Sequence, residues 1–229
     1  MSEQVREMFA SIARRYDAAN EVLSLGVHRS WRRAAVQLSK ARPGQRVLDC
    51  ATGTGDLALA FKRAVGPDGE VVGADFCAEM LASAAPKARR AGLDVRFQVA
   101  DALALPFADD SFDIASIAFG IRNVDDPVLC LREMARVVRA GGRVVVLEFG
   151  QPHGPFGALF RVYSRRVMPA VGASLTGNRD AYEYLPRTAA AFPAGERFLA
   201  LMDEAGPFAK RSATPLLAGT AYVYVGTVR

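Results

Sequence analysis

Cysteine, histidine and long apolar runs are scarce in this chain of 229 residues. Its three cysteines, Cys50, Cys77 and Cys130, are widely spaced and form no CxxC pair, so we expect neither a disulfide framework nor a metal site such as zinc. No apolar run approaches the roughly 20 residues that cross a bilayer, and the N-terminal residues lack the apolar core of a signal peptide. We therefore expect a soluble protein of the reducing cytoplasm.

The charge pattern argues against one class of partner. The formal net charge is +5, but the arginines are scattered rather than gathered in one run, so we expect no nucleic acid as a partner. A moderate excess of positive charge still favours contact with an anionic surface such as a membrane. With 51% hydrophobic and 23% charged residues, the composition is typical of an ordinary globular protein.

Strands and helices alternate along most of the chain, which predicts a doubly wound, mostly parallel α/β sheet with right-handed crossovers. We expect one domain over 1–229, with a helical lobe at 1–41, a cofactor-binding core at 42–150, a lid or substrate insertion at 151–194, and a helix with two strands at 195–229. The predicted strands are 46–50, 70–74, 95–99, 112–119, 143–149, 208–213 and 220–228, and the predicted helices of the core are 56–65, 78–90 and 126–139.

A glycine-rich turn follows the first predicted strand of the core. In the segment 47–58, an apolar strand gives way to Gly53-Thr54-Gly55 and then to a helix. Glycines reach positive φ at low cost and let a ligand approach the main chain, so these three residues are candidates to bind a nucleoside cofactor. The spacing also satisfies the dinucleotide fingerprint, so the turn alone does not distinguish a nucleoside cofactor from a dinucleotide.

Acidic residues stand at the ends of successive predicted strands, where ligands of such sheets bind. Asp49 can meet an ammonium group, Asp75 can accept both hydroxyls of a ribose, and Asp101 can accept from an adenine amino group beside the Ala102 amide. Three acids favour the cationic sulfonium of S-adenosyl-L-methionine over a pyrophosphate. Each acid taken alone fits a helix cap or a turn equally well, as for Asp56 and Asp101.

The sequence resembles the menaquinone and ubiquinone biosynthesis C-methyltransferases over nearly its whole length. The resemblance rests on two signatures. The first comprises Tyr16-Asp17-Ala18-Ala19-Asn20, Ser24, His28 and Trp31, and the second spans 136–148. The likeness continues through Ala104-Leu105-Pro106-Phe107, 119–124, 182–186 and 218–221. Ala118 and Gly150 depart from the pattern, because serine is common in the family at both positions. The resemblance implies the seven-stranded, Rossmann-like sheet of class I S-adenosyl-L-methionine-dependent methyltransferases, with N-terminal helices and an inserted lid.

The resemblance also implies an activity and roles for particular residues. The expected reaction transfers a methyl group to a ring carbon of a prenylated quinol, most simply demethylmenaquinol to menaquinol, with 2-polyprenyl-6-methoxybenzoquinol as the alternative. Arg122 and Asn123 are the expected catalytic residues, Arg122 by stabilising a phenolate or organising a water, although Arg122 could instead pair with an acid such as Asp125. Tyr16 and Tyr184 are expected to contact the quinol, with Tyr182 as a further candidate.

A prenylated substrate requires a protein that reaches a bilayer. Apolar and basic residues are interspersed over 156–168, which suits an amphipathic helix at an anionic interface, although a helix of this kind more commonly packs its apolar face on the sheet. We expect transient peripheral contact at the inner face of the plasma membrane, and the sequence leaves a homodimer open. Three other functions fit the residues: a nicotinamide-dependent reductase, a non-catalytic subunit of a quinone-synthesis complex, and a methyltransferase for another lipid.

Overall fold

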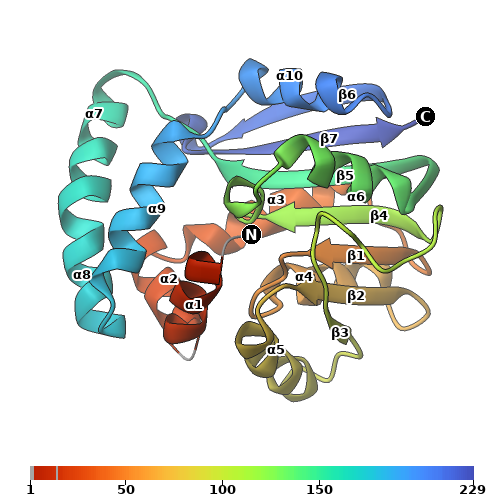
Figure 1. The fold of residues 1–229 in the computed structure, drawn as a ribbon, viewed down its shortest axis with the longest axis horizontal. Coiled ribbons are helices and arrows are strands. Elements are labelled where there is room, and N and C mark those ends of the chain that lie inside the picture. Colours follow the sequence, from red (N-terminus) through yellow and green to blue (C-terminus); the bar gives the residue numbers. More distant parts are fainter. Residues whose placement is uncertain (1–2, 14) are drawn as a thin grey trace.

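The computed structural model describes residues 3–13 and 15–229, and its centre is a seven-stranded sheet (Figure 1). The strand order is β3-β2-β1-β4-β5-β7-β6, with β7 antiparallel to both of its neighbours and the remaining pairs parallel. This confirms the expected mixed α/β sheet. The strands are β1 (Arg46–Cys50), β2 (Glu70–Asp75), β3 (Arg96–Val99), β4 (Phe112–Ala118), β5 (Val138–Phe149), β6 (Phe208–Leu216) and β7 (Ala221–Val228).

Helices cover both faces of this sheet, because the central strands carry apolar side chains on both sides. In β1, Val47 packs with one core cluster and Leu48 with the other, as the alternation of a strand requires. The first cluster includes α3 (Val27–Ser39) and α4 (Asp56–Val65); the second includes α6 (Pro127–Arg136) and α10 (Glu196–Ala205). Helix α5 (Ala78–Arg90) joins β2 to β3. The predicted bounds of α4 and α5 are confirmed.

The remaining helices lie beyond the carboxyl ends of the parallel strands. In Figure 1 the arrows of β1 and β4 end on the left, beside the N-terminal helices and the helices of the 151–194 segment. These are α1 (Glu3–Ile12), α2 (Tyr16–Ser24), α7 (Gly154–Val162), the π-helical η2 (Tyr163–Val167), α8 (Met168–Thr176) and α9 (Arg179–Ala191). Two short 3-10 turns, η1 (Ile121–Asn123) and η3 (Leu217–Gly219), lie after β4 and before β7. Helices therefore cover the carboxyl ends of the parallel strands.

One predicted boundary is wrong, and the reason is a bulge. The pair Gly141-Gly142 was expected to stop a helix at Arg139, but α6 ends at Arg136 and β5 already begins at Val138. Phe112 pairs with Val138, and Ile114 pairs with Arg143, so β5 advances five residues while β4 advances two. The glycines thus form a bulge within a strand. The helical lobe consists of α1, α2 and α3, and β6 extends three residues beyond its predicted end. Within the described ranges, no helix is both long and apolar enough to cross a membrane.

Candidate active site

The glycine turn after β1 has the backbone conformation that its sequence predicts. Gly53 and Gly55 have φ values of 58° and 84°, which side chains rarely adopt. A Cβ atom on Gly55 would lie 3.1 Å from the ring of Phe97 and 3.2 Å from the Cβ of Ala84, so the turn packs directly on its surroundings. The turn therefore needs glycine for both its dihedral angles and its close contacts.

Two of the predicted acids hold this turn in place. The Asp75 carboxylate accepts hydrogen bonds from Gly53 N at 2.7 Å and from Cys77 N at 2.8 Å, while burial raises the pKa of Asp75. A carboxylate has about four lone-pair sites, so Asp75 can still accept ribose hydroxyls. Asp49 differs from the expectation: it is buried, and both its oxygens accept hydroxyl groups, from Thr52 at 2.6 Å and Ser116 at 2.7 Å. These bonds order the loop, and the contact of Asp49 with an ammonium group stays a prediction.

The third acid lies in the loop after β3. Asp101 is half-buried, forms a bridge to Ala104, and its Oδ1 accepts a hydrogen bond from Leu103 N at 3.0 Å. These local bonds fit the turn that was the alternative interpretation of Asp101. Within the described part of the chain these bonds use Oδ1 and not Oδ2, and Ala102 beside Asp101 is also half-buried. The pair thus keeps the acceptor and the backbone amide that an adenine would need.

Thr54 serves a purpose that the sequence did not reveal. Its hydroxyl donates to Asp17 Oδ1 at 2.6 Å and accepts from Lys87 Nζ at 3.0 Å. Lys87 also pairs with Asp17 and, at 2.8 Å, with Asp56. This polar cluster joins α2 to the glycine turn and to α5. Helix α2 is thereby fastened over the cofactor turn, which suits a part that closes a site.

Arg122 is placed by an unusual turn at the end of β4. Phe119 adopts a φ of 56°, and a Cβ atom on Gly120 would lie 2.6 Å from the Cβ of Ala51, so the chain reverses tightly there. The guanidinium then pairs with Glu148 at 2.9 Å and lies over the Phe149 ring, 5.2 Å from its centroid. The two charged side chains are 3% and 1% exposed. The ion-pair partner is thus an acid on β5 and not merely a neighbour in sequence.

This ion pair is incompletely satisfied. Among the described residues, Arg122 Nε and Glu148 Oε2 find no hydrogen-bond partner, although both atoms are buried. Burial raises the pKa of Glu148, while the adjacent guanidinium favours its charged form. A donor and an acceptor therefore remain unused beside the cavity that Arg122 lines. Buried polar groups without partners often mark functional positions.

The other predicted site residues fall into three groups. Asn123 and Tyr184 meet: the Tyr184 hydroxyl donates to Asn123 Oδ1 at 3.1 Å, although the two residues are 61 positions apart. Tyr16 lines the same cavity as Arg122. Tyr182 instead packs among the helices, because a Cβ atom on Gly172 would come within 2.2 Å of its ring. His28 is buried and bonded to Glu21 at 3.0 Å.

An apolar cavity of about 430 Å³ opens beside Arg122. Its walls come from α2, α3, the end of β4, α7, η2 and η3, and they are almost entirely hydrocarbon and aromatic. The lining includes Tyr16, Leu23, Leu25, Trp31, Phe119, Arg122, Phe149, Phe156, Leu159, Phe160, Tyr163, Leu185 and Leu217. The Tyr163 hydroxyl donates to the Leu23 carbonyl at 2.6 Å, so α2 and η2 are tied together along the wall. Such a cavity accepts an aromatic ring with a hydrocarbon tail.

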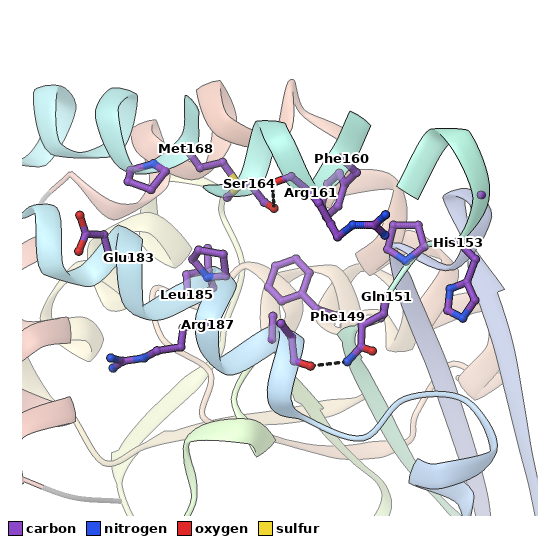
Figure 2. A pocket seen from close by; sticks show the side chains of 17 residues that line it. Phe149, Gln151, His153, Phe160, Arg161, Ser164, Met168, Glu183, Leu185 and Arg187 are labelled. Carbon is purple, nitrogen blue, oxygen red and sulfur yellow. Dashed lines mark hydrogen bonds between the residues drawn. The ribbon is translucent and has the colours of Figure 1, made fainter. Parts of the chain in front are cut away.

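A second, larger cleft of about 780 Å³ adjoins this cavity across Phe149, Phe160, Met168 and Leu185. In Figure 2, the labelled side chains of α7 and η2 face those of α9 across it. The cleft is also lined by polar side chains, including those of Arg161, Glu183 and Arg187. Because burying charged groups against hydrocarbon is costly, the 430 Å³ cavity is the better site for a prenylated ring.

Sequence reasoning did not assign roles to two residues that shape the site. Glu148 stood in the second family signature, but nothing in the sequence paired it with Arg122, 26 residues away. Lys87 lies on a helix with ordinary amphipathic spacing, so its contact with Thr54 and Asp17 left no sequence signal. Both could have been found only by asking which opposite charges the neighbouring strand ends bring together.

The geometry fits S-adenosyl-L-methionine at the strand ends. The glycine turn, with its positive φ values, lies at the carboxyl ends of the strands, and Met80 Cε lies 3.3 Å from the Cβ position of Gly53. Asp75 and Asp101 provide hydrogen-bond acceptors at the next strand ends. These groups match an adenosine with free ribose hydroxyls. They offer no cationic side chain in the turn itself, as a pyrophosphate would favour.

Two solved structures that are titled methyltransferases share this fold. An S-adenosylmethionine-dependent methyltransferase from Thermotoga maritima superposes with a TM-score of 0.68 at 20% identity, covering 97% of this chain and 99% of that one. One from Aquifex aeolicus has a TM-score of 0.62 at 16% identity, over 86% and 89% of the two chains. At such identities the likeness shows the fold alone.

The sequence comparisons are closer. The "Ubiquinone/menaquinone biosynthesis C-methyltransferase UbiE" of Bdellovibrio bacteriovorus is 54% identical over 99% of this chain and 97% of its own. The "Demethylmenaquinone methyltransferase" of Thermus thermophilus is 51% identical over 96% and 99%. The model of the ubiE/COQ5 methyltransferase family matches residues 1–227. The chain therefore belongs to the ubiE/COQ5 family and is an S-adenosyl-L-methionine-dependent C-methyltransferase of quinone biosynthesis.

Proposed function

We propose that this enzyme methylates demethylmenaquinol, giving menaquinol. The observation that supports it is the apolar cavity of about 430 Å³, which is lined by the buried cation Arg122 at the strand ends. Two relatives, from Thermus thermophilus and Deinococcus radiodurans, carry the name demethylmenaquinone methyltransferase at 51% and 49% identity. Methylation of 2-polyprenyl-6-methoxybenzoquinol is the second candidate, because the relative from Bdellovibrio bacteriovorus is named for both quinones.

The strand-end residues would hold the donor. Asp75 would accept the ribose hydroxyls, Asp101 the adenine amino group, and the Ala102 amide would address a ring nitrogen, while the turn at 53–55 follows the remaining backbone of the ligand. When bound, S-adenosyl-L-methionine supplies an electrophilic methyl group. The Asp17 and Lys87 contacts to Thr54 would keep α2 closed over it and exclude water.

The cavity residues would prepare the quinol. A ring hydroxyl that loses its proton makes the adjacent ring carbon nucleophilic, and that carbon later releases its own proton to restore aromaticity. A guanidinium has donors and no acceptor, so the proposed role of Arg122 is to stabilise the phenolate charge rather than to act as a base. Tyr16 would pack against the ring, and the hydrogen bond from Tyr184 to Asn123 would hold η1, the turn that carries Arg122, in place.

One assay separates the two substrates. Purified enzyme is incubated with methyl-labelled donor and either reduced demethylmenaquinone or reduced 2-polyprenyl-6-methoxybenzoquinone, and the lipids are separated by chromatography. Label in menaquinol at a kcat/KM well above that for the benzoquinol supports the proposal. Label found only in the benzoquinol product would make the enzyme one of ubiquinone synthesis.

We further propose that the reaction takes place at the cytoplasmic face of a membrane, because the tail of a prenylated quinol is embedded in the bilayer. The cavity is enclosed by α2, α7 and η2, outside the sheet, where a tail can leave it.

A further inference from the structure

Three strongly exposed leucines meet at the rim of the substrate cavity. Leu25, Leu159 and Leu217 are 86%, 69% and 52% exposed, and all three line the cavity. They come from the turn after α2, from α7 and from η3, which lie far apart in the sequence. Phe156 and Val162 of α7 are also exposed. Scattered apolar residues on a surface are normal, but a cluster around one opening indicates an interaction site.

Two of these leucines occupy backbone positions that favour other residues. Leu25 ends α2 with a φ of 50°, and Leu217 has a φ of 41°. Glycine or asparagine usually fills such left-handed positions, because a branched side chain is strained there. Neither leucine is buried in return for that strain. The side chains therefore do not serve the stability of the isolated chain, which points to a surface that covers them.

The surrounding charge indicates which surface this is. Residues 149–179 contain four arginines and no aspartate or glutamate. Arg161 and Arg166 are exposed within the helices that carry Leu159. On α3, the exposed Arg29 pairs with Glu21 at 2.9 Å, and Arg29 and Arg33 line a separate cleft with acidic residues, so the positive charge near the leucines is that of α7 and η2. Apolar side chains beside such arginines are complementary to an anionic bilayer, whose phosphates meet the cations while the hydrocarbon meets the leucines.

We propose that Leu25, Leu159 and Leu217, the leucine rim, insert into an anionic membrane and place the cavity mouth against the hydrocarbon. This rests on the proposed function, and it adds the surface through which the quinol enters. The tail then passes from lipid to cavity without crossing water, and the α2–η2 bond at Tyr163 keeps the two walls of the opening together.

The test measures binding of the full chain to vesicles, with neither donor nor quinol present. Phosphatidylcholine vesicles with and without phosphatidylglycerol are sedimented, and the bound fraction is compared for L25Q, L159Q, L217Q and their triple combination. Each substitution should lower the partition coefficient about tenfold. L129Q is the matched control, since Leu129 is 38% exposed on α6, and it should bind like the native chain. R161Q and R166Q should each lower binding to anionic vesicles about fivefold, with little effect on neutral ones.

Two outcomes would overturn the proposal. Equal binding of the triple variant, the L129Q control and the native chain, with unchanged thermal unfolding, would show that the leucines do not touch lipid. A dimer of the native chain in sedimentation velocity that the triple variant abolishes, without a change in vesicle binding, would assign the rim to a second copy of the chain. Methylation of a quinol in detergent is measured separately, so failure of the rim and failure of the proposed activity are distinguishable.

Discussion

Removing the charges of the Arg122–Glu148 pair singly and together would separate its structural role from its chemical one. Both side chains are nearly inaccessible, and their closest atoms are 2.9 Å apart. Deleting one partner of such a pair leaves a buried charge uncompensated, which costs about 3–5 kcal/mol. Replacing both by apolar side chains of similar length is often neutral or stabilising. Arg122→Met and Glu148→Met should therefore each lower the free energy of unfolding by about 3–5 kcal/mol, and the double variant should lie within about 2 kcal/mol of the native chain.

The chemistry should not recover with the stability. If the guanidinium stabilises the phenolate, Arg122→Met and the double variant should both lose about 100- to 1,000-fold in kcat, as is usual when one stabilising donor is removed. Donor affinity should stay near the native value in the double variant, because among the described residues neither side chain of the pair hydrogen-bonds to the glycine turn or to Asp75. Urea denaturation gives the stabilities, transfer of a labelled methyl group gives kcat, and calorimetry gives the donor affinity.

Two results would refute this reasoning. A double variant that is folded and turns over at the native rate would show that Arg122 takes no part in the chemistry. Single losses that simply add in the double variant would show that the two side chains are not coupled. Recovered stability combined with lost turnover is the expected pattern, and Leu129→Gln serves as a control that should alter neither quantity.

Three further predictions follow from the residues around the cofactor turn. Burial raises the pKa of Asp49 from 3.8 to about 6, so its contribution to stability is present below about pH 4 and is lost as pH rises through about 6. The Asp49→Asn variant should lack this pH dependence. The difference between its free energy of unfolding and that of the native chain should therefore rise by about 3 kcal/mol between pH 4 and 7. A difference that stays constant with pH in urea denaturation would contradict the prediction. Gly55→Ala should cost about 1–2 kcal/mol from its φ of 84° and weaken donor binding in calorimetry, whereas native affinity would show that the turn can adapt. Asp17→Asn should raise the KM for the donor severalfold with kcat nearly unchanged, and an unaltered KM would mean that the Thr54–Asp17–Lys87 cluster does not close the site.

Local patterns were sufficient to predict the core of the fold. The period of the apolar residues and the turn signals located α4 and α5 to the residue, because strong local preferences and tertiary packing agree there. The start of β5 was missed, since Gly141-Gly142 has the same sequence signature in a helix stop and in a bulge. Only the pairing of Phe112 with Val138 decides between them, and pairing is a long-range property.

The sequence indicated individual candidate residues of the site but not the contacts between them. The glycine turn and Asp75 follow from the strand-to-helix pattern, and Arg122 with Asn123 from the family resemblance. Asp49 was expected to face a ligand, but it is buried, and its carboxylate oxygens accept hydrogen bonds from Ser116 of the adjacent strand and Thr52 of the loop. The reductase interpretation is wrong, since the chain belongs to a methyltransferase family. That Tyr16 and Leu159 share one cavity depends on how α2 and α7 pack, which no local pattern encodes.

The most direct measurement is a crystal structure of this chain with S-adenosyl-L-homocysteine and a short-tailed demethylmenaquinone. The expected result places the ribose hydroxyls on Asp75, the adenine beside Asp101, and the quinone ring in the apolar cavity with an oxygen facing Arg122. The nucleoside bound away from the carboxyl ends of the strands, or the ring bound in the polar cleft beside α9, would contradict the central claim.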